Sequence, residues 1–228
     1  MAKMKHIILT RFNVPFSTWE HLLTDEWMEE RFDIFDNICY PSVEGQTNKN
    51  FKWILICDPN TKSEWRKKID SYELATPVYC DWPKRLKYIL EVVGDAQYLI
   101  TTRLDNDDAL NKYTVEEIQK KFDFQKEHYI NFPRVIITDG EYYSINIEPS
   151  NPFVTLIEER PFKTVWSVKH GNARYSKSIQ QNDNIVAGLR IIHGRNASNR
   201  MGLRSRLLEN CKEKKDFTVC GEFLNKLL

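Results

Sequence analysis

The sequence has almost no surplus of charge. Thirty-three basic side chains stand against 32 acidic ones, which leaves a formal charge of +1 over 228 residues. Such a balance creates no bulk field that would draw the protein to nucleic acid or to an anionic membrane surface. Nucleic acid is therefore not an expected partner, and any anion has to be bound by a local group of side chains.

Long apolar runs are also absent. No stretch approaches the roughly 20 apolar residues that a membrane-spanning helix needs. The opening residues 1–5 lead into a short strand-like run and not into the apolar core of a signal peptide. The sequence therefore predicts a cytoplasmic protein without a transmembrane segment, and it leaves peripheral contact with a membrane open.

Cysteine and glycine are sparse as well. The five cysteines are odd in number, widely scattered and without C-x-x-C spacing, which argues against a disulfide framework or a zinc knuckle. We expect reduced and mostly buried thiols. No repeat, low-complexity tract or glycine-rich linker divides the chain, so residues 1–228 are predicted to form a single domain.

The first half of the chain alternates strand-like and helix-like segments. Short apolar runs predict strands, and three- and four-residue apolar spacing predicts helices. This alternation indicates the α/β class, a Rossmann-type α/β/α sandwich with a mainly parallel central sheet. Strands are expected at 6–10, 51–57, 76–79 and 97–102, and helices at 17–37, 61–71 (with a Thr61–Glu64 capping box) and 82–93.

Ligands of such sheets bind beyond the carboxyl ends of the strands. Polar side chains follow the predicted strands at Arg11, Asp58 and Asp105, and we expect them to share one edge. For the second half of the chain the sequence predicts a helix over 114–125, a hairpin of strands 135–138 and 142–147 joined by Asp139-Gly140, a short helix over 153–159, and a basic amphipathic, helical tail over 203–228.

The main chemical signal is Asp105-Asn106-Asp107-Asp108, directly after a predicted strand. Three carboxylates so close together repel one another unless a cation or a guanidinium neutralises them. Mg2+ and Mn2+ prefer oxygen ligands and are often shared between carboxylates and substrate phosphates. The alternative is a solvated acidic turn paired with nearby basic side chains such as Arg103. An EF-hand loop is disfavoured because Ala109 and Leu110 occupy positions that need an oxygen ligand and a glycine.

Several motifs together resemble one family. The most specific is Thr101-Thr102-Arg103-Leu104-Asp105-Asn106-Asp107-Asp108-Ala109. It is joined by the weaker motifs Leu9-Thr10-Arg11-Phe12-Asn13, Tyr40-Pro41-Ser42-Val43 with Gln46, Phe51-Lys52-Trp53 leading to Asp58, Asn151-Pro152-Phe153 with Glu158, and Ile192-His193-Gly194-Arg195-Asn196. With these motifs the chain resembles the "putative rhamnosyltransferase" family, a branch of the GT-A-like glycosyltransferases, over most of its length.

The resemblance implies a nucleotide-binding half, residues 1–110, and an acceptor-binding half, residues 111–228. It implies that Asp105 and Asp107 match the metal motif and that Asp58 recognises the nucleoside of the donor. Neutralisation of the diphosphate is a candidate role for three guanidinium groups, which can each bind phosphate oxygens in two places. These are Arg11, Arg85 and Arg103, and each of them could instead form a structural ion pair.

A late histidine is a candidate third metal ligand, as in many GT-A enzymes, because neutral imidazole binds Mn2+ alongside carboxylates. His193 is our first choice because Arg195, Asn196 and Arg200 follow it as anion-binding groups, and His170 is the second. The competing interpretation for each is a histidine that donates to a backbone carbonyl at a turn.

An inverting transferase also needs a carboxylate base for the acceptor hydroxyl. The candidates for this base are Glu158, Glu159 and Asp183. Asp108 could turn toward the sugar and is a further catalytic candidate. Glu158 follows an apolar run that would aim it inward, whereas Asp183 by default would cap a helix start. A retaining enzyme would not require this base, and the sequence does not decide between the two outcomes.

These residues predict a glycosyltransferase that uses Mn2+ or Mg2+ and moves a sugar from a nucleotide-diphosphate donor to a glycan or other hydroxyl acceptor. The alternative is a non-catalytic module of the same fold that binds a nucleotide sugar or a glycan. A metal-dependent phosphoesterase is a third hypothesis, and too few metal ligands are visible in the sequence for it.

Overall fold

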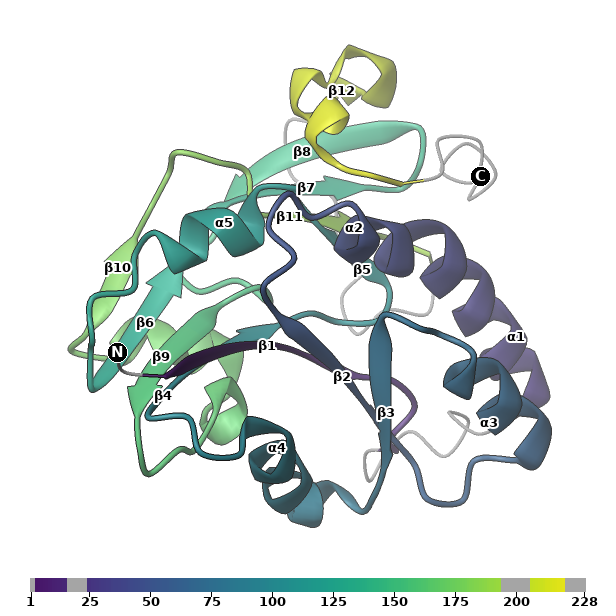
Figure 1. Cartoon of the computed structure of the whole chain (residues 1–228). Helices are drawn as coiled ribbons and strands as arrows, with labels where there is room; N and C mark the ends of the chain where they lie inside the picture. Colours follow the sequence, from purple (N-terminus) through teal and green to yellow (C-terminus); the bar gives the residue numbers. More distant parts are fainter. Residues whose placement is uncertain (1–2, 16–23, 194–205, 220–228) are drawn as a thin grey trace.

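A seven-stranded mixed sheet forms the centre of the molecule (Figure 1). The computed structural model describes residues 3–15, 24–193 and 206–219. Across the sheet the strand order is β10-β6-β9-β4-β1-β2-β3, and every neighbouring pair is parallel except the two that involve β9. The strands are β1 (Met4–Arg11), β2 (Lys52–Cys57), β3 (Ala75–Tyr79), β4 (Tyr98–Arg103), β6 (Glu127–Asn131), β9 (Thr155–Glu159) and β10 (Ile179–Gln181).

Helices cover both faces of this sheet. A continuous helical segment, α1 (Asp25–Ile34), the π-helical turn η2 (Phe35–Cys39) and α2 (Tyr40–Glu44), lies on one face with α3 (Ser63–Asp70) and α5 (Thr114–Gln119). The helix α4 (Arg85–Val93), preceded by the turn η3 (Trp82–Lys84), lies on the other. Alternate residues of the buried strands therefore enter two separate cores, and the predicted α/β/α sandwich with its largely parallel sheet is confirmed.

The core on the α1 face is rich in aromatic side chains. Phe32 and Phe35 of the α1–η2 segment pack beside Trp53 of β2, which is fully buried. The Trp53 indole Nε1 donates to Thr10 Oγ1 over 2.9 Å, so its one polar atom is satisfied inside the core. Thr24 begins α1 by accepting a hydrogen bond from the Trp27 backbone N–H.

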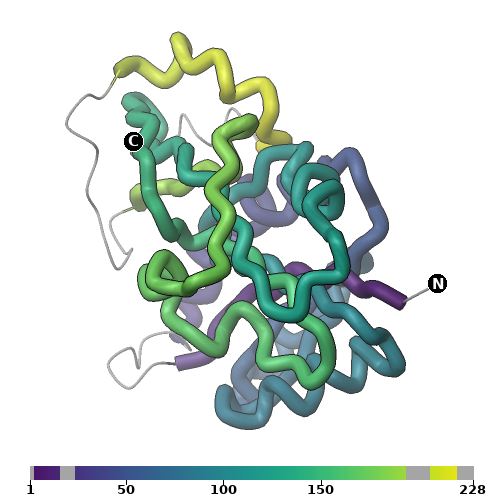
Figure 2. The backbone as a smooth tube through the Cα atoms, turned by 90° about the vertical axis from the view of Figure 1, so that its left-hand side faces the viewer, coloured from purple at the N-terminus to yellow at the C-terminus, as the bar shows by residue number. Residues whose placement is uncertain are grey.

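A second, five-stranded sheet packs beside the first, and the sequence did not predict it. Its order is β12-β8-β7-β11-β5, with β7 (Arg134–Thr138) and β8 (Tyr142–Ile147) forming the predicted hairpin. The other strands are β5 (Asp108–Leu110), β11 (Gly188–Ile191) and β12 (Arg206–Leu207). In both views the segment 206–219 lies at the end of the molecule that carries this sheet, far from α4 (Figure 2).

Several local predictions were wrong. Residues 155–159 form the buried strand β9 and not a helix, because a short apolar run fits either element and here it fills the place between β4 and β6. Thr61 does not cap α3. Lys62 is the N-cap, and the Thr61 hydroxyl donates to the Asp58 carbonyl instead. The helix from Thr114 ends at Gln119, short of Gln125.

The predicted helical tail is also wrong where the structure describes it. Residues 206–219 form β12 and two 3-10 turns, η6 (Leu208–Asn210) and η7 (Lys212–Asp216), and the rest of 203–228 lies outside the described residues. In the predicted helix 17–37, residues 17–23 likewise lie outside them. The cysteines of the described part, Cys39, Cys57, Cys80 and Cys211, are buried free thiols, as expected. Over the same part of the chain, no helix has both the length and the apolarity needed to span a membrane.

Candidate functional site

The polar strand tips meet at one edge of the central sheet, as predicted. Arg11 ends β1 beside Ile56 of β2, and Arg103 ends β4 beside Leu9 of β1. Asp58 follows the last residue of β2. Since β1, β2 and β4 are parallel, these side chains lie at the carboxyl ends of adjacent strands, where open α/β sheets bind their ligands.

The acidic turn, Asp105-Asn106-Asp107-Asp108, connects the two sheets. Arg103 is the last residue of β4 in the central sheet, and Asp108 is the first residue of β5 in the second sheet. The turn is fixed from below by Asn106, which is buried: its amide donates to the Phe12 carbonyl over 2.5 Å and its Oδ1 accepts from Arg31 over 3.1 Å. The sequence thus places the carboxylates of this turn where the two halves of the fold join.

Asp105 is paired with Arg103. The guanidinium Nη2 lies 2.8 Å from Oδ2 and 3.1 Å from Oδ1, and Nε adds a longer contact of 3.3 Å. On its other side, Arg103 Nη1 donates to His170 Nδ1 over 2.6 Å. Burial, followed by the charge of Arg103, lowers the pKa of His170 to about 4, so at neutral pH the ring is an uncharged acceptor that holds the guanidinium.

Asp107 is paired with a second arginine and with a histidine. Its Oδ2 lies 2.8 Å from Arg31 Nη1 and 3.1 Å from His193 Nε2. Burial alone would raise the pKa of Asp107, but the Arg31 charge and the hydrogen bond and charge of His193 outweigh it and hold the pKa below its usual range. The structure therefore brings the first-choice histidine to the acidic turn, directly onto one of the two proposed metal ligands.

Asp108 faces into the second sheet. It is 5% exposed and lies opposite Arg190 of β11 in the antiparallel pair β5–β11. Burial and the neighbouring Asp107 carboxylate raise the pKa of Asp108 well above its usual range, while Arg190 opposes this shift. Asp108 is consequently enclosed by protein and not directed into open solvent.

Arg31 is a residue of the candidate site that the sequence analysis did not identify. It comes from α1, is 5% exposed, and stacks on the Trp27 ring with 4.8 Å between its Cζ and the ring centroid. A signal was present in the sequence: Arg31 follows Trp27 by four residues and precedes Phe35 by four, so a charged side chain sits on the apolar stripe of the helix. Such a residue needs a buried partner of opposite charge.

The other two candidate arginines lie around one tryptophan. The Cζ atom of Arg11 lies 5.6 Å from the centroid of the Trp82 ring, and that of Arg85 lies 4.1 Å from it. The Trp166 ring packs against the same ring, with 4.9 Å between the two centroids. Burial lowers the pKa of Arg11 to about 10 against the attraction of the Asp105 carboxylate. Arg11 is therefore close to the acidic turn, whereas Arg85 donates to the backbone carbonyls of Trp82 and Trp166.

Asp58 is mostly buried at the tip of β2. Its Oδ1 accepts from the Asn60 backbone N–H over 2.6 Å, and its own N–H donates to Asn13 Oδ1 over 3.1 Å. The Asn13 amide also donates to Thr61 Oγ1 over 2.9 Å. This small network holds the ends of β1 and β2 together and fixes the Asp58 carboxylate at the predicted edge.

The positions of Glu158 and Asp183 argue against the role of base that we predicted for them. Glu158 pairs with Leu99 near the start of β4, at the end of the sheet opposite Asp105, and its two oxygens accept the backbone N–H groups of Lys163 and Thr164. Burial raises its pKa. Asp183 is exposed in the loop after the outermost strand β10 and begins no helix.

The donor types at the turn suit a divalent cation only in part. No three His, Cys, Asp or Glu side chains converge closely enough to hold a metal within residues 3–15, 24–193 and 206–219. Asp105 faces Arg103, which leaves Asp107 and His193 as the pair that meets. Two protein ligands are enough where substrate phosphates and water complete the shell, as is usual for Mg2+. His193 Nε2 now donates to Asp107, so a cation bound at Nε2 would require this nitrogen to give up its proton.

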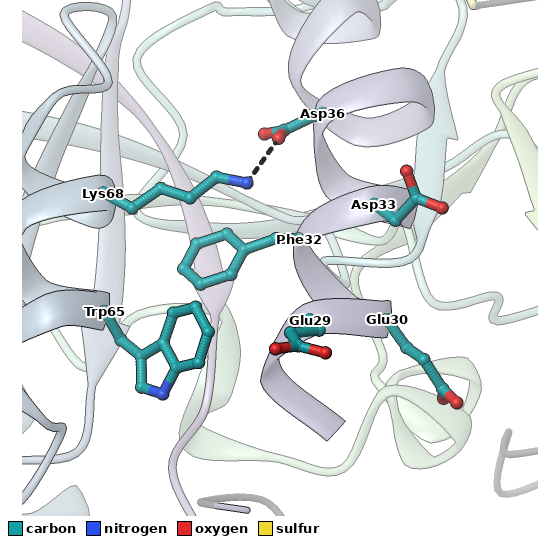
Figure 3. Close-up of a pocket in the computed structure, with 7 residues that line it drawn as sticks. All are labelled: Glu29, Glu30, Phe32, Asp33, Asp36, Trp65 and Lys68. Atoms are coloured by element: carbon teal, nitrogen blue, oxygen red, sulfur yellow. Dashed lines mark ion pairs between the residues drawn. The ribbon is translucent and has the colours of Figure 1, made fainter. Parts of the chain in front are cut away.

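A separate hollow of about 440 Å3 lies between α1 and α3 (Figure 3). The rings of Phe32 and Trp65 face it, and an ion pair of 2.8 Å joins Lys68 to Asp36 across its end. Its remaining lining side chains are the carboxylates Glu29, Glu30 and Asp33. None of the predicted site residues lines this hollow. The carboxyl edge of the central sheet is the better candidate for the functional site, because charged side chains of β1, α1, β4 and β5 lie there.

Comparison with solved structures gives remote similarities. Residues 1–349 of S. aureus TarS in complex with UDP align at a TM-score of 0.48 and 10% identity, over 83% of this chain and 60% of that one. The same TarS fragment with UDP-GlcNAc aligns at 0.48 and 11%, over 86% and 60%. The "putative nucleotide-diphospho-sugar transferase" from Desulfovibrio desulfuricans G20 aligns at a TM-score of 0.40 and 11% identity, over 84% of this chain and 81% of that one. This chain thus spans about 60% of the TarS fragment.

No curated protein sequence matches the chain. A family model does: the family described as "Putative rhamnosyl transferase" matches residues 5–205, which is most of the 228 residues. The match includes every residue of the acidic turn and the strands of both sheets, apart from Met4 at the start of β1 and from β12, which lies beyond residue 205. With its Arg103–Asp108 motif at the carboxyl edge of a Rossmann-type sheet, the chain belongs to this family of glycosyltransferases.

Proposed function

We propose that this protein transfers a sugar from a nucleotide-diphosphate donor to a hydroxyl acceptor such as a glycan, with a divalent cation, Mn2+ or Mg2+, bound at the acidic turn. The observation that supports this most directly is the set of facing charges at the sheet edge. Asp105 and Asp107 are each paired with a guanidinium group, and Arg11 adds a third cationic group beside them. Positive charge there suits a diphosphate.

The diphosphate would lie along this edge in our proposal. Arg11 is half-buried at the end of β1 and is the arginine best placed to reach phosphate oxygens. Arg103 is held between Asp105 and His170, so its orientation is set before a ligand arrives. Preorganised donors of this kind act without reorganisation during the reaction. Arg85 contributes by stacking on Trp82, beside Arg11.

Asp107 and His193 would hold the cation, whose chemistry is to neutralise the charge that develops on the leaving diphosphate. Asp105 would face the donor through Arg103. Asp58, fixed at the tip of β2 by Asn13 and Asn60, would recognise the nucleoside. Among the predicted catalytic residues, Asp108 is the one that lies in the acidic turn, and by its position it becomes our candidate for the base if the reaction inverts configuration.

The proposal is tested by thermal unfolding with a panel of nucleoside diphosphates, such as UDP, GDP and dTDP, each with and without Mn2+. A ligand present at a hundred times its Kd raises the free energy of unfolding by about 2.7 kcal/mol. We expect one nucleotide to stabilise the protein in a manner that depends on Mn2+.

Asp107→Asn should remove this Mn2+ dependence and leave the unfolding transition cooperative. Asp123→Asn is the matched control, because Asp123 is exposed before β6, at the opposite edge of the sheet. Nucleotide binding that is equally metal-dependent in Asp107→Asn would refute the cation site. Slow hydrolysis of the matching nucleotide sugar would support an enzyme, whereas tight binding without any turnover would favour a non-catalytic module.

A further inference from the structure

Arg31 reaches the acidic turn from α1, and it is unusually buried for a charged side chain. It is 5% exposed, its Nη1 lies 2.8 Å from Asp107 Oδ2 and 3.1 Å from Asn106 Oδ1, and its guanidinium group lies over the Trp27 ring. Its Nε is buried and has no hydrogen-bond partner among the described residues. A buried N–H group without a partner lowers the stability of the folded protein. The contacts of Nη1 with Asp107 and Asn106 must therefore offset this cost and hold the side chain in place.

The position of Arg31 conflicts with that of a cation. Nη1 occupies the same carboxylate oxygen that His193 contacts, which is the oxygen placed to hold a metal ion in our proposed function. A divalent ion would have to displace this N–H group or accept a positive charge a few ångströms away. Repulsion between such charges is strong in a site that excludes water. The donor diphosphate brings the negative charge that would relieve it.

We propose that Arg31 is a positioning residue that acts through Asp107: it neutralises the carboxylate in the ligand-free protein and opposes binding of a divalent cation alone. The cation then binds tightly only together with the diphosphate. This inference rests on the proposed cation site and adds an order to its assembly. A protein built in this way does not hold an idle metal ion, and it keeps Asp107 in place between turnovers.

The test is the affinity for Mn2+ alone, measured from the electron paramagnetic resonance signal of the free ion. Arg31→Gln removes the charge and keeps a planar hydrogen-bonding group, and the Kd for Mn2+ should fall by about tenfold or more. Arg31→Lys keeps the charge and should bind Mn2+ like the wild type. Arg160→Gln is the matched control, because Arg160 donates to the carbonyls of Gly94 and Ala96, away from the acidic turn.

A second measurement separates this role from simple support of the fold. In the presence of a chelator Arg31→Gln should melt at a lower temperature than the wild type, and saturating Mn2+ should raise its melting temperature by more than it raises that of the wild type. If the glutamine variant does not fold, Arg31→Met keeps the packing on Trp27 and replaces it in both experiments.

The outcomes are distinct. Mn2+ affinity that is unchanged or weaker in Arg31→Gln, with the ion bound by both proteins, overturns the role of Arg31 and leaves the cation site standing. Binding of Mn2+ by neither the wild type nor any variant overturns the cation site and this inference together. Tight binding only in the variants that lack the charge supports it most strongly.

Discussion

Acidification should unfold this protein in large part through one histidine of the central sheet. His6 lies in β1, is 2% exposed, and is bonded at both ring nitrogens: Nε2 is 2.8 Å from Thr102 Oγ1, and Nδ1 accepts from the Gln119 amide over 3.2 Å. Thr102 in turn lies 2.8 Å from Thr155 Oγ1. This arrangement satisfies a neutral ring and offers no carboxylate to a charged one.

Burial lowers the pKa of His6 from 6.5 to about 3. The unfolded chain therefore binds a proton below about pH 6.5 that the folded chain refuses until about pH 3, so stability is lost as the pH falls through this window. Between about pH 7.5 and pH 4.5 the difference amounts to about 2.7 kcal/mol for this one group. That is a large share of the ~5–15 kcal/mol by which domains are stable.

The assay is urea unfolding at a series of pH values for the wild type and for His6→Gln. The variant starts from lower stability but should lose about 2–3 kcal/mol less than the wild type on acidification. Thr155→Val is the control, since it removes the last hydroxyl of the same hydrogen-bond chain and retains the imidazole, and it should keep the wild-type pH dependence. Parallel pH profiles for the wild type and His6→Gln would refute the reasoning.

Two further predictions concern the packing around Gly188 and the role of Glu158. Gly188→Ala places a Cβ 2.1 Å from the Phe153 ring and should lower the free energy of unfolding by about 1–3 kcal/mol, whereas Gly171→Ala, with no heavy atom of the described residues within 4 Å, should be close to neutral in the same denaturant titration. Glu158→Gln should cost about 1–3 kcal/mol of stability by removing an acceptor for the backbone N–H of Lys163 or Thr164, yet leave kcat of sugar transfer unchanged. A hundredfold loss in kcat with intact folding would contradict this purely structural role of Glu158.

The sequence was most informative about the edge of the central sheet. Arg11, Asp58 and Asp105 each follow a short apolar run, and parallel strands with helical crossovers must bring such tips together. His193 and Asp107 were each predicted as metal ligands, and the structure brings their side chains into contact, while their use for a metal stays a prediction. Local patterns suffice where the connection between neighbours is a regular crossover.

The rest depended on long-range pairing, which local patterns do not encode. In the second sheet β5 pairs with β11, which is far away in the chain, and no local pattern near Asp108 predicts this pairing. Residues 155–159 form an apolar run too short to separate a strand from a helix, and their place between β4 and β6 decides. Arg31 was hidden because a helix with mostly apolar spacing was expected to bury only apolar side chains.

The link between the two sheets constrains how this protein can vary. Residues 104–107 are the whole connection between the end of β4 and the start of β5. The Leu104 backbone N–H donates to the Leu9 carbonyl of β1, and the Asn106 side chain donates to the carbonyl of Phe12, directly after β1. An added or deleted residue here would force one sheet to slide against the other or would rotate an aspartate away from its arginine. An insertion or deletion in this short segment should therefore disturb the protein more than the same change in one of its exposed loops.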